Sequence, residues 1–415
     1  MGSSTATKAQ DHVTWTLAEW AAGLTFEKLS DEAVDRAKLF LYDSFGCGLG
    51  GAQQHDVEIA LEHAKQMGGA PTCTVIGSGH KCDPVTAAFL NSLCIRAMDY
   101  NDIYWKADPS HPSDIIPAAL SICEMLGQGG KELILGTVIA YEVEMRLCEM
   151  GLPGIREYGW HHATLTAFAS PIVAGRMLGL TVDQIQQAIG ISASPMCTLG
   201  AVTAGKLTMM KNTVDPMATR AGVEAALLAK RGYSGPQHVI DGKEGLTHVF
   251  GHAHKGGKQV AFDLSRLTEG LPSSKDAHYK VLDCGMKSFP IEALSHAPLT
   301  AMMKCVEEHK IKADDVVEIK VEVIARAADI LGDPAKYRPT GKETADHSLP
   351  YSLAVGLVDG MVTPLQFKQS RIDDTSLHAV MDKVKVVANE EFEKLFPEYQ
   401  PSQVTLTLKD GSKHS

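Results

Sequence analysis

The sequence predicts a mainly α-helical protein built from a large all-helical domain, residues 1–265, and a smaller α+β domain, residues 270–415. Up to about residue 265 the apolar residues recur with the period of an amphipathic helix, whereas beyond residue 310 they alternate with charged residues, as in a half-buried strand. Residues 263–280, between the two patterns, are rich in serine, proline, glycine and charge, which is typical of a domain boundary.

Helix boundaries in the first part follow from capping residues. A serine, threonine or aspartate before an apolar run accepts hydrogen bonds from the first N–H groups of a helix, and proline suits its first turn. Such residues predict three helix starts: Ser30 for a helix that ends near Gly48, Asp83-Pro84 for a helix that runs towards Met98, and Thr181, with Gln184 at capping-box spacing, for a third. A fourth helix is predicted over residues 218–230 because Gly232 would end it. Abundant alanine and glycine indicate close helix packing in a buried core.

The second part combines strands with helices. Three runs place apolar residues at every second position: Val317, Ile319, Val321 and Val323, then Val384 and Val386, then Val404, Leu406 and Leu408. Helices are predicted over residues 348–358 and 374–381. Asp410-Gly411 is a hairpin signal, yet only four residues follow it, so we expect the intact protein to continue beyond them.

Composition argues against several classes of protein. A net charge of −11 does not suit a nucleic-acid partner, which requires a basic surface. The nine cysteines include no C-x-x-C pair, so neither a disulfide framework nor a clustered metal site is predicted. No secretory signal opens the chain, and the longest apolar run, residues 133–141, is too short to span a membrane. We therefore expect a soluble, cytoplasmic protein that binds neither nucleic acid nor membrane.

Residues 99–114 are the strongest candidate for a functional site. They carry four acids, one histidine and one lysine between two apolar helical segments, and Pro109 and Pro112 stiffen the turn around His111. Titratable groups of both signs, held at the end of a helix, are what proton-transfer chemistry requires. The alternative interpretation is a solvated, charged loop between helices.

Three further groups place histidine or lysine at a helix start or near the predicted domain boundary: Trp160-His161-His162, Lys206 with Lys211 and Arg220, and Lys287 with His296. A helix start lowers a histidine's pKa and favours anions. The cations of the second group could hold carboxylates, and the third group could complete a site in a cleft. The alternatives are surface or capping histidines, a solvated helix start and a histidine on a helix face. In the polar run 338–348, Ser348 or Asp346 is expected to cap the next helix.

Motifs for cofactors are missing from the sequence. It contains no Walker loop, no H-E-x-x-H and no G-x-S-x-G. Its one G-x-G-x-x-G match, residues 46–51, closes a predicted helix instead of following a strand, so it does not predict a dinucleotide site. The histidines lack paired metal-ligand spacing, so no metal is predicted either. Acid–base chemistry by histidine, aspartate and lysine, without a cofactor, is the remaining interpretation.

Together these segments resemble the MmgE/PrpD family, which includes 2-methylcitrate dehydratase and cis-aconitate decarboxylase. The resemblance covers nearly the whole chain, and these segments carry it: residues 98–102 with 111–114, the Trp160-His161 helix start, Lys211 ahead of Gly222, residues 287–290 and residues 343–351. It implies a large helical domain, a smaller α+β lid, a site in the cleft between them, and a homodimer. Matched by position, the catalytic residues are Asp99, His111, His161, Lys211 and, from the lid, His296.

Three details bear on the substrate. The twelve-residue interval from Asp99 to His111 is similar to that of the 2-methylcitrate dehydratases and longer than in animal cis-aconitate decarboxylases. Ile103 stands where these relatives often carry a threonine, and residues 212–216 lack the histidine or extra basic residue of many members. Both departures lie where a polycarboxylate would be held, so the substrate stays open.

The residues and the resemblance together predict a cofactor-independent lyase, foremost a dehydratase of a hydroxylated di- or tricarboxylate such as 2-methylcitrate. Eliminating water needs a base, an acid and cations for the carboxylates. His111 or His161 is expected to be the base or the acid, and Asp99 to orient a histidine. Three lysines are expected to bind the substrate: Lys206, Lys211 and Lys287. Cis-aconitate decarboxylation and epimerisation of an iminodisuccinate-like substrate are the alternatives; a non-catalytic helical scaffold is disfavoured because the chain has no internal repeat.

Overall fold

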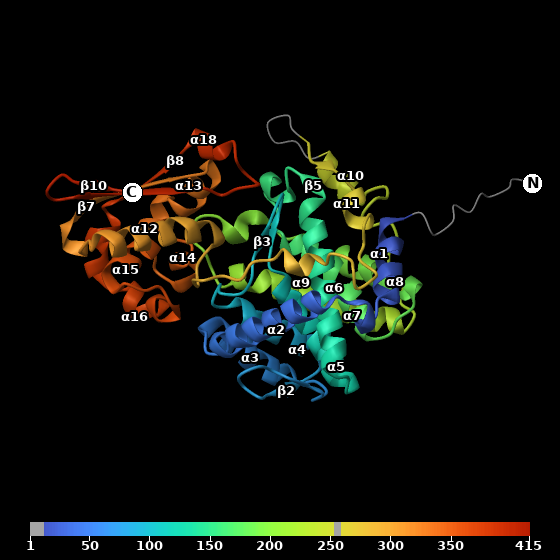
Figure 1. Cartoon of the computed structure of the whole chain (residues 1–415). Coiled ribbons are helices and arrows are strands. Elements are labelled where there is room, and N and C mark those ends of the chain that lie inside the picture. The colour runs from blue at the N-terminus through green and yellow to red at the C-terminus, as the bar shows by residue number, and fades with distance from the viewer. Residues whose placement is uncertain (1–11, 253–258) are drawn as a thin grey trace, which may run out of the picture. The chain divides into compact units, whose positions relative to one another are not determined.

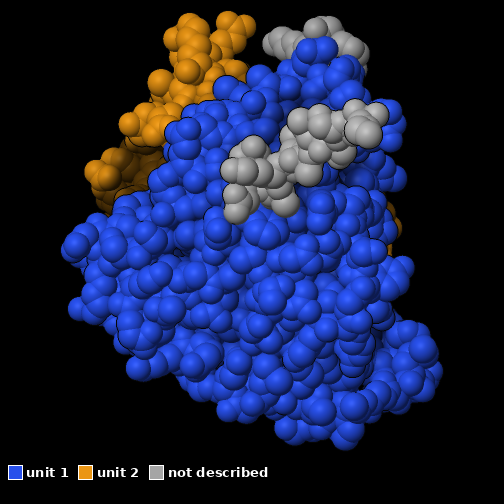
Figure 2. Space-filling model, turned by 90° about the vertical axis from the view of Figure 1, so that its right-hand side faces the viewer, with its two compact units in different colours: residues 1–97, 101–201, 212–286 blue, residues 98–100, 202–211, 287–415 orange. Residues whose placement is uncertain are grey.

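The computed structural model describes residues 12–252 and 259–415 and is mainly helical, as predicted (Figure 1). The chain divides into two compact units, which Figure 2 colours separately. The helical unit comprises residues 1–97, 101–201 and 212–286, and the mixed unit comprises residues 98–100, 202–211 and 287–415. The two short segments of the mixed unit carry Asp99 and Lys211, so each unit holds part of the predicted site.

Two central helices form much of the core of the helical unit. Its helices are α1 (Val13–Gly23), α2 (Asp31–Gly51), α3 (His55–Met67), α4 (Pro84–Arg96), α5 (Ile116–Leu126), α6 (Gly130–Glu149), α7 (Ala163–Met177), α8 (Val182–Ala193), α9 (Met210–Lys230, which begins in the mixed unit), α10 (Leu246–Gly251) and α11 (Ser265–Thr268). Helix α6 is buried from Leu135 to Cys148, and α7 along nearly its whole length. No helix of the described chain is long and apolar enough to cross a membrane.

The helical unit also contains strands, which the prediction of an all-helical domain did not include. Three antiparallel pairs of two residues each occur: β1 (Cys73–Thr74) with β2 (Lys81–Cys82), β3 (Tyr104–Trp105) with β4 (Pro109–Ser110), and β5 (Gly151–Leu152) with β6 (Ala261–Phe262). A two-residue strand is too short to show an alternating pattern, so the sequence carries no periodic signal for it.

The predicted helix starts are confirmed by their capping bonds. Ser30 accepts from the N–H of Ala33, and Asp83 accepts from two N–H groups at the start of α4. Thr181 and Gln184 form a reciprocal capping box at α8. Three boundaries differ from the prediction: α2 ends at Gly51 rather than near Gly48, α4 ends at Arg96 rather than towards Met98, and α9 begins at Met210 rather than near residue 218. Pro216 inside α9 reads in the sequence as a helix breaker, which hides the earlier start.

The mixed unit contains one four-stranded sheet and short helices. The strand order is β10 (Lys413–His414), β9 (Gln403–Leu408), β7 (Val316–Val323), β8 (Val384–Ala388), with β7 and β8 parallel and the other neighbours antiparallel. Its helices are α12 (His296–His309), α13 (Ala325–Leu331), α14 (Lys342–Ala345), α15 (Leu349–Asp359), α16 (Gln369–Ile372), α17 (His378–Met381) and α18 (Glu390–Glu393). The helix predicted over residues 374–381 is a 3₁₀ turn followed by α17.

One of the residues that the alternation placed on the buried face of β7 is exposed instead. A register shift between β7 and β9 lies at Val316 and Glu318. It leaves Val316 buried and Val317 46% exposed, whereas the inward residues from Ile319 onward follow the prediction. An irregularity of this kind reverses the facing of the residues before it, so the alternation alone could not place Val317.

The G-x-G-x-x-G match lies inside α2, where its last glycine allows close helix packing. A Cβ on Gly51 would lie 1.9 Å from the carbonyl oxygen of Cys94 on α4, whereas a Cβ on Gly46 would meet nothing within 4 Å. We expect Gly51→Ala to lower the free energy of unfolding by about 1–3 kcal/mol through overpacking. The matched control Gly46→Ala should be neutral or stabilising by up to about 1 kcal/mol. Equal melting temperatures for the two variants would contradict this role of Gly51.

Candidate active site

The mixed unit holds a buried aspartate between two lysines. Lys287 Nζ donates to Asp99 Oδ1 at 3.0 Å, and Lys211 Nζ lies 3.2 Å from the same oxygen. Lys287 Nζ also lies 3.0 Å from the backbone carbonyl of Asp99. The three side chains are 2% exposed or less. Asp99 has a φ of 51°, a left-handed conformation that costs a non-glycine residue about 1–2 kcal/mol and is typical of functional sites.

A histidine–aspartate pair adjoins this group. His347 Nδ1 lies 2.6 Å from Asp346 Oδ1 and 3.8 Å from Asp99 Oδ2. Burial, followed by the charge of Lys211, lowers the pKa of His347 to about 4. Burial alone would raise the pKa of Asp346, but the ammonium groups of Lys211 and Lys342 lower it to about 2. We call Asp99, Lys211, Lys287, Asp346 and His347 the lysine cluster; its two buried ammonium groups favour an anionic ligand.

The other predicted residues of the mixed unit lie apart from these contacts. His296 begins α12 and is partly buried, with Nε2 3.4 Å from the carbonyl of Ile291. Burial, followed by the charge of Lys287, lowers the pKa of His296 to about 4. The side chain of Lys206 is exposed. The structure therefore supports Lys211 and Lys287 as ligands of a buried anion better than Lys206.

The helical unit brings three histidines together. His161 and His162 precede α7, and their rings lie 3.9 Å apart, whereas the rings of His111 and His162 lie 5.6 Å apart. His162 Nε2 is 3.4 Å from Oδ1 of Asp215, a residue of α9. All four side chains are buried. We call His111, His161, His162 and Asp215 the histidine cluster.

Two of these histidines form a hydrogen bond with the backbone through Nδ1. His111 Nδ1 lies 2.6 Å from the carbonyl oxygen of Asp102. His161 Nδ1 accepts from the backbone N–H of Ala163 at 3.2 Å, in the first turn of α7. Burial, followed by the proximity of His162, holds the pKa of His161 well below its usual value. Burial likewise lowers the pKa of His162, although Asp215 opposes this. The ring of His161 is therefore neutral at pH 7.

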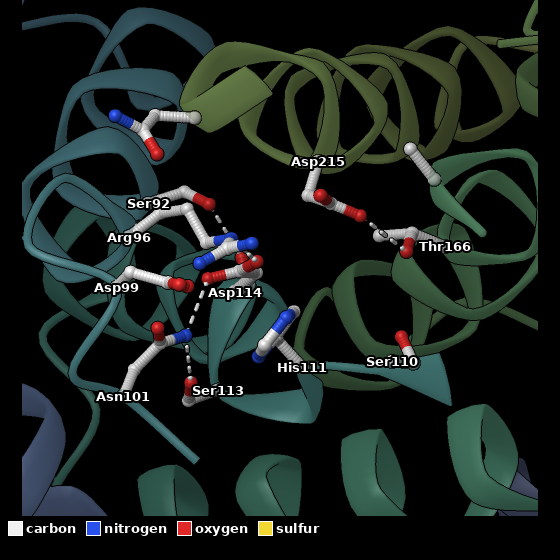
Figure 3. Close-up of polar contacts among 12 residues, drawn as sticks. Ser92, Arg96, Asp99, Asn101, Ser110, His111, Ser113, Asp114, Thr166 and Asp215 are labelled. Atoms are coloured by element: carbon white, nitrogen blue, oxygen red, sulfur yellow. Dashed lines mark hydrogen bonds and ion pairs between the residues drawn. The ribbon is translucent and has the colours of Figure 1, made fainter. Parts of the chain in front are cut away.

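Buried hydrogen bonds hold the loop that carries His111. Asn101 Nδ2 donates to Ser113 Oγ at 2.9 Å and to Asp114 Oδ1 at 3.0 Å, as Figure 3 shows. Ser113 Oγ in turn lies 2.5 Å from Asp102 Oδ1, and its N–H donates to the same carboxylate. Burial raises the pKa of Asp102 to about 6. Because these side chains are buried, the alternative of a solvated loop is wrong for this segment.

Thr166 connects another buried acid, Glu144, to Asp215 of the histidine cluster. Thr166 Oγ1 is 2.9 Å from Glu144 Oε1 and 3.4 Å from Asp215 Oδ1. Figure 3 shows the contact between Thr166 and Asp215. Ser110 Oγ bonds to the same oxygen of Glu144. Burial raises the pKa of Glu144 to about 8, so it is mostly protonated at pH 7. Burial would also raise the pKa of Asp215, but His162 holds it below its usual range. Asp215 is thus the ionised acid beside the histidines.

Sequence reasoning missed some of these residues. Asp215 and Glu144 were not predicted as site residues, because nothing local shows that Asp215 faces a histidine or that Glu144 is buried beside Ser110 and Thr166. Asp346 and His347 lay in the polar run considered for a helix cap, and Ser348 is the residue that caps α15 by accepting from the N–H of Tyr351. Because Ser348 accounts for the cap, the adjacent Asp346 and His347 could have been recognised from the sequence as candidate site residues. Arg220, weighed as a carboxylate ligand, has an exposed side chain.

Among residues 12–252 and 259–415, three groups of side chains place possible metal-ligand atoms within 4.8 Å of one another: His12 with His238 and Asp241, His161 with His162 and Asp215, and Asp99 with Asp346 and His347. Two ammonium groups already contact Asp99, and their charge opposes a cation in the third group. In the second group, the N–H of Ala163 occupies the lone pair on Nδ1 of His161. The surroundings of the third group therefore favour an anion over a metal ion.

Comparisons with known proteins match both parts of the chain. The model of the MmgE/PrpD N-terminal domain matches residues 15–258, and that of the MmgE/PrpD C-terminal domain matches residues 289–415. A cis-aconitate decarboxylase of Aspergillus terreus is 25% identical over 97% of this chain and 84% of its own length. The cis-aconitate decarboxylase of Mus musculus is 26% identical (96% and 80%), and a 2-methylcitrate dehydratase of Salmonella typhi is 26% identical (94% and 81%).

Proposed function

The chain belongs to the MmgE/PrpD family, and we propose that it is a cofactor-independent lyase that eliminates water from a hydroxylated di- or tricarboxylate such as 2-methylcitrate. The observation that carries the proposal is the pair of buried lysines, Lys211 and Lys287, on one oxygen of Asp99. Burying two ammonium groups costs free energy unless anions compensate them. A site that buries two ammonium groups is therefore suited to binding a substrate with several carboxylates.

Each cluster contains groups of a kind that such an elimination needs. A carbon-bound proton next to a carboxylate becomes acidic enough to remove only when cations or hydrogen-bond donors stabilise the charge that develops on the carboxylate. We assign that task to Lys211 and Lys287, and assign the orientation of these lysines to Asp99. The chemistry at the reacting carbon and at the leaving hydroxyl group is assigned to His111 and His161, with Asp215 and His162 as positioning residues. His296 is retained as a proposed catalytic residue, and Lys206 as a weaker candidate for substrate binding.

A substrate screen tests the proposal directly. The purified protein is incubated with citrate, 2-methylcitrate, cis-aconitate and related acids, while ultraviolet absorbance reports a new conjugated double bond. Proton NMR of the same samples separates loss of water from loss of carbon dioxide and from inversion at a carbon. Formation of an unsaturated acid with release of water supports the dehydratase. Absence of any new signal with every acid would contradict it.

Cis-aconitate decarboxylation is the second candidate. The relatives of that name cited above match 96–97% of this chain, slightly more than the dehydratase. Decarboxylation also develops charge next to a carboxylate and then requires a proton at carbon, so the same histidines and lysines could serve it. Epimerisation of an iminodisuccinate-like acid is a third reaction of this type. Carbon dioxide released from cis-aconitate in the screen would establish the second reaction in place of the first.

We also propose that the protein is a cytoplasmic homodimer. Helix α2 exposes Leu39, Tyr42 and Leu49 at helical spacing, 55%, 82% and 57% exposed respectively, and a second copy could cover this apolar face. Eight of the nine cysteines are buried as thiols, which suits a reducing compartment. Sedimentation at micromolar concentration should give the mass of a dimer; the mass of a monomer would contradict it.

Activity should not depend on a metal ion. Lys211 and Lys287 supply positive charge where the substrate's carboxylates would otherwise need a cation, so we expect turnover to be unchanged after dialysis against EDTA. The measurement is the initial rate before dialysis, after it, and after addition of zinc or magnesium. A rate that is abolished by EDTA and restored by one of the metals would show that a group such as His161, His162 and Asp215 binds it.

A further inference from the structure

The hydrogen bonds at Nδ1 of His111 and His161 run in opposite directions, and this fixes which nitrogen holds the lone pair when each ring is neutral. A carbonyl oxygen only accepts, so Nδ1 of His111, 2.6 Å from the carbonyl of Asp102, must donate its proton. A backbone N–H only donates, so Nδ1 of His161, 3.2 Å from the nitrogen of Ala163, must hold a lone pair. The lone pair of His111 is therefore on Nε2, whereas the proton of His161 is on Nε2.

From this difference we infer that His111 is the base that takes the carbon-bound proton at Nε2, and that His161 is a neutral hydrogen-bond donor that keeps its proton on Nε2. The inference rests on the proposed lyase function and adds a division of roles that neither the sequence nor the family resemblance supplies. Each role follows from a contact with the backbone, and the backbone cannot reverse its donor and acceptor groups.

The surroundings of His161 keep its ring neutral. It is buried, His162 lies against it at 3.9 Å, and the N–H of Ala163 belongs to the first turn of α7, where the helix dipole opposes a positive charge. Asp215 opposes these effects but contacts His162 instead, at 3.4 Å. A neutral ring with one fixed N–H suits stabilisation of negative charge on a substrate oxygen without proton transfer.

With these two roles, every proton and electron pair in the elimination of water is accounted for. The proton passes from the substrate carbon to Nε2 of His111, and its electron pair forms the second bond between the two carbons. The pair of the breaking C–O bond leaves with the hydroxyl oxygen. The proton on His111 then converts the departing hydroxide into water, which returns His111 to its starting tautomer. His161 donates a hydrogen bond throughout and ends as it began.

The tautomers can be measured without any substrate. In protein labelled with ¹⁵N-histidine, long-range proton–nitrogen spectra distinguish a protonated ring nitrogen from one with a lone pair. The two rings are assigned by the signals that disappear in His111→Asn and in His161→Gln. We expect a protonated Nδ1 for His111 and a protonated Nε2 for His161. A protonated Nδ1 on His161, or a lone pair on Nδ1 of His111, overturns the inference whatever the enzyme's activity.

Amide substitutions test the roles on the substrate that the screen identifies. Glutamine places an N–H₂ group near the position of Nε2, and asparagine places its amide near the position of Nδ1. We expect His161→Gln to stay within about tenfold of the wild-type rate, and His161→Asn to lose roughly 10²-fold or more because the donor is absent. His111→Gln and His111→Asn should both lose roughly 10²-fold or more, because neither amide is a base.

The two assays separate failure of the inference from failure of the proposed function. If His161→Gln were as slow as His161→Asn, a donor alone would not suffice and the inference would be wrong, although the enzyme would still be a lyase. If no acid in the screen reacted, the proposed function would be wrong, and the base and donor roles, which depend on it, would be overturned with it. The spectra would then still establish which nitrogen carries each proton.

Discussion

Replacing His111 by alanine is expected to lower kcat on the true substrate by roughly 10²–10⁴-fold, the usual effect of removing a positioned base. His161→Ala should cost a comparable factor, because it removes a buried donor to developing charge. Both rates are measured by the absorbance of the product double bond at saturating substrate. His63→Ala, an exposed histidine on α3, is the matched control and should keep the wild-type rate.

Loss of activity in His111→Ala must be separated from loss of folding. The histidine is only 6% exposed and donates to the carbonyl of Asp102, so alanine removes that donor at a cost of about 1–3 kcal/mol. Burial of the ring therefore leads us to expect a less stable variant. Thermal unfolding of each variant defines the temperature at which the rates are compared. Wild-type turnover by folded His111→Ala would refute the assignment of His111.

The features that were predicted correctly depend on neighbours in the sequence. Ser30, Asp83 and Thr181 cap helices by bonding to N–H groups two or three residues further on, so a short segment contains the whole interaction. The switch from helical to strand periodicity near residue 310 is likewise a local signal, and β7 begins at Val316. Such features need no knowledge of the tertiary structure.

The features that were missed depend on contacts between distant segments. Asp215 becomes a site residue only because α9 places it beside His162, and the sequence of α9 does not reveal that neighbour. The pKa of Glu144, about 8, follows from complete burial, which no pattern within α6 distinguishes from the burial of its apolar neighbours. The roles of His111 and His161 were open for the same reason: backbone groups that the folded chain places at Nδ1 decide them.

Lys211→Met is the second variant with a large expected effect, because it removes an ammonium group and keeps most of the aliphatic stem. The charge lies 3.2 Å from Asp99 and is almost fully buried. Removing one member of a buried, charged group costs about 2–5 kcal/mol, so kcat/KM should fall by roughly 10²-fold or more. Both a higher KM and a lower kcat are expected, since the substrate's charge rises in the transition state.

Two further variants test whether the expected fall in kcat/KM is specific to the charge of Lys211. Lys211→Arg keeps the charge, but the guanidinium is planar and larger than the ammonium group, so we expect only partial recovery. Lys230→Met removes a charge from an exposed side chain at the other end of α9 and should change kcat/KM by less than about threefold, because water screens it. If Lys211→Met lowered the melting temperature by many degrees but left the kinetics unchanged, Lys211 would be structural. Lys287, the other lysine on Asp99, would then be the ligand of the carboxylate, and Lys287→Met should produce the kinetic loss instead.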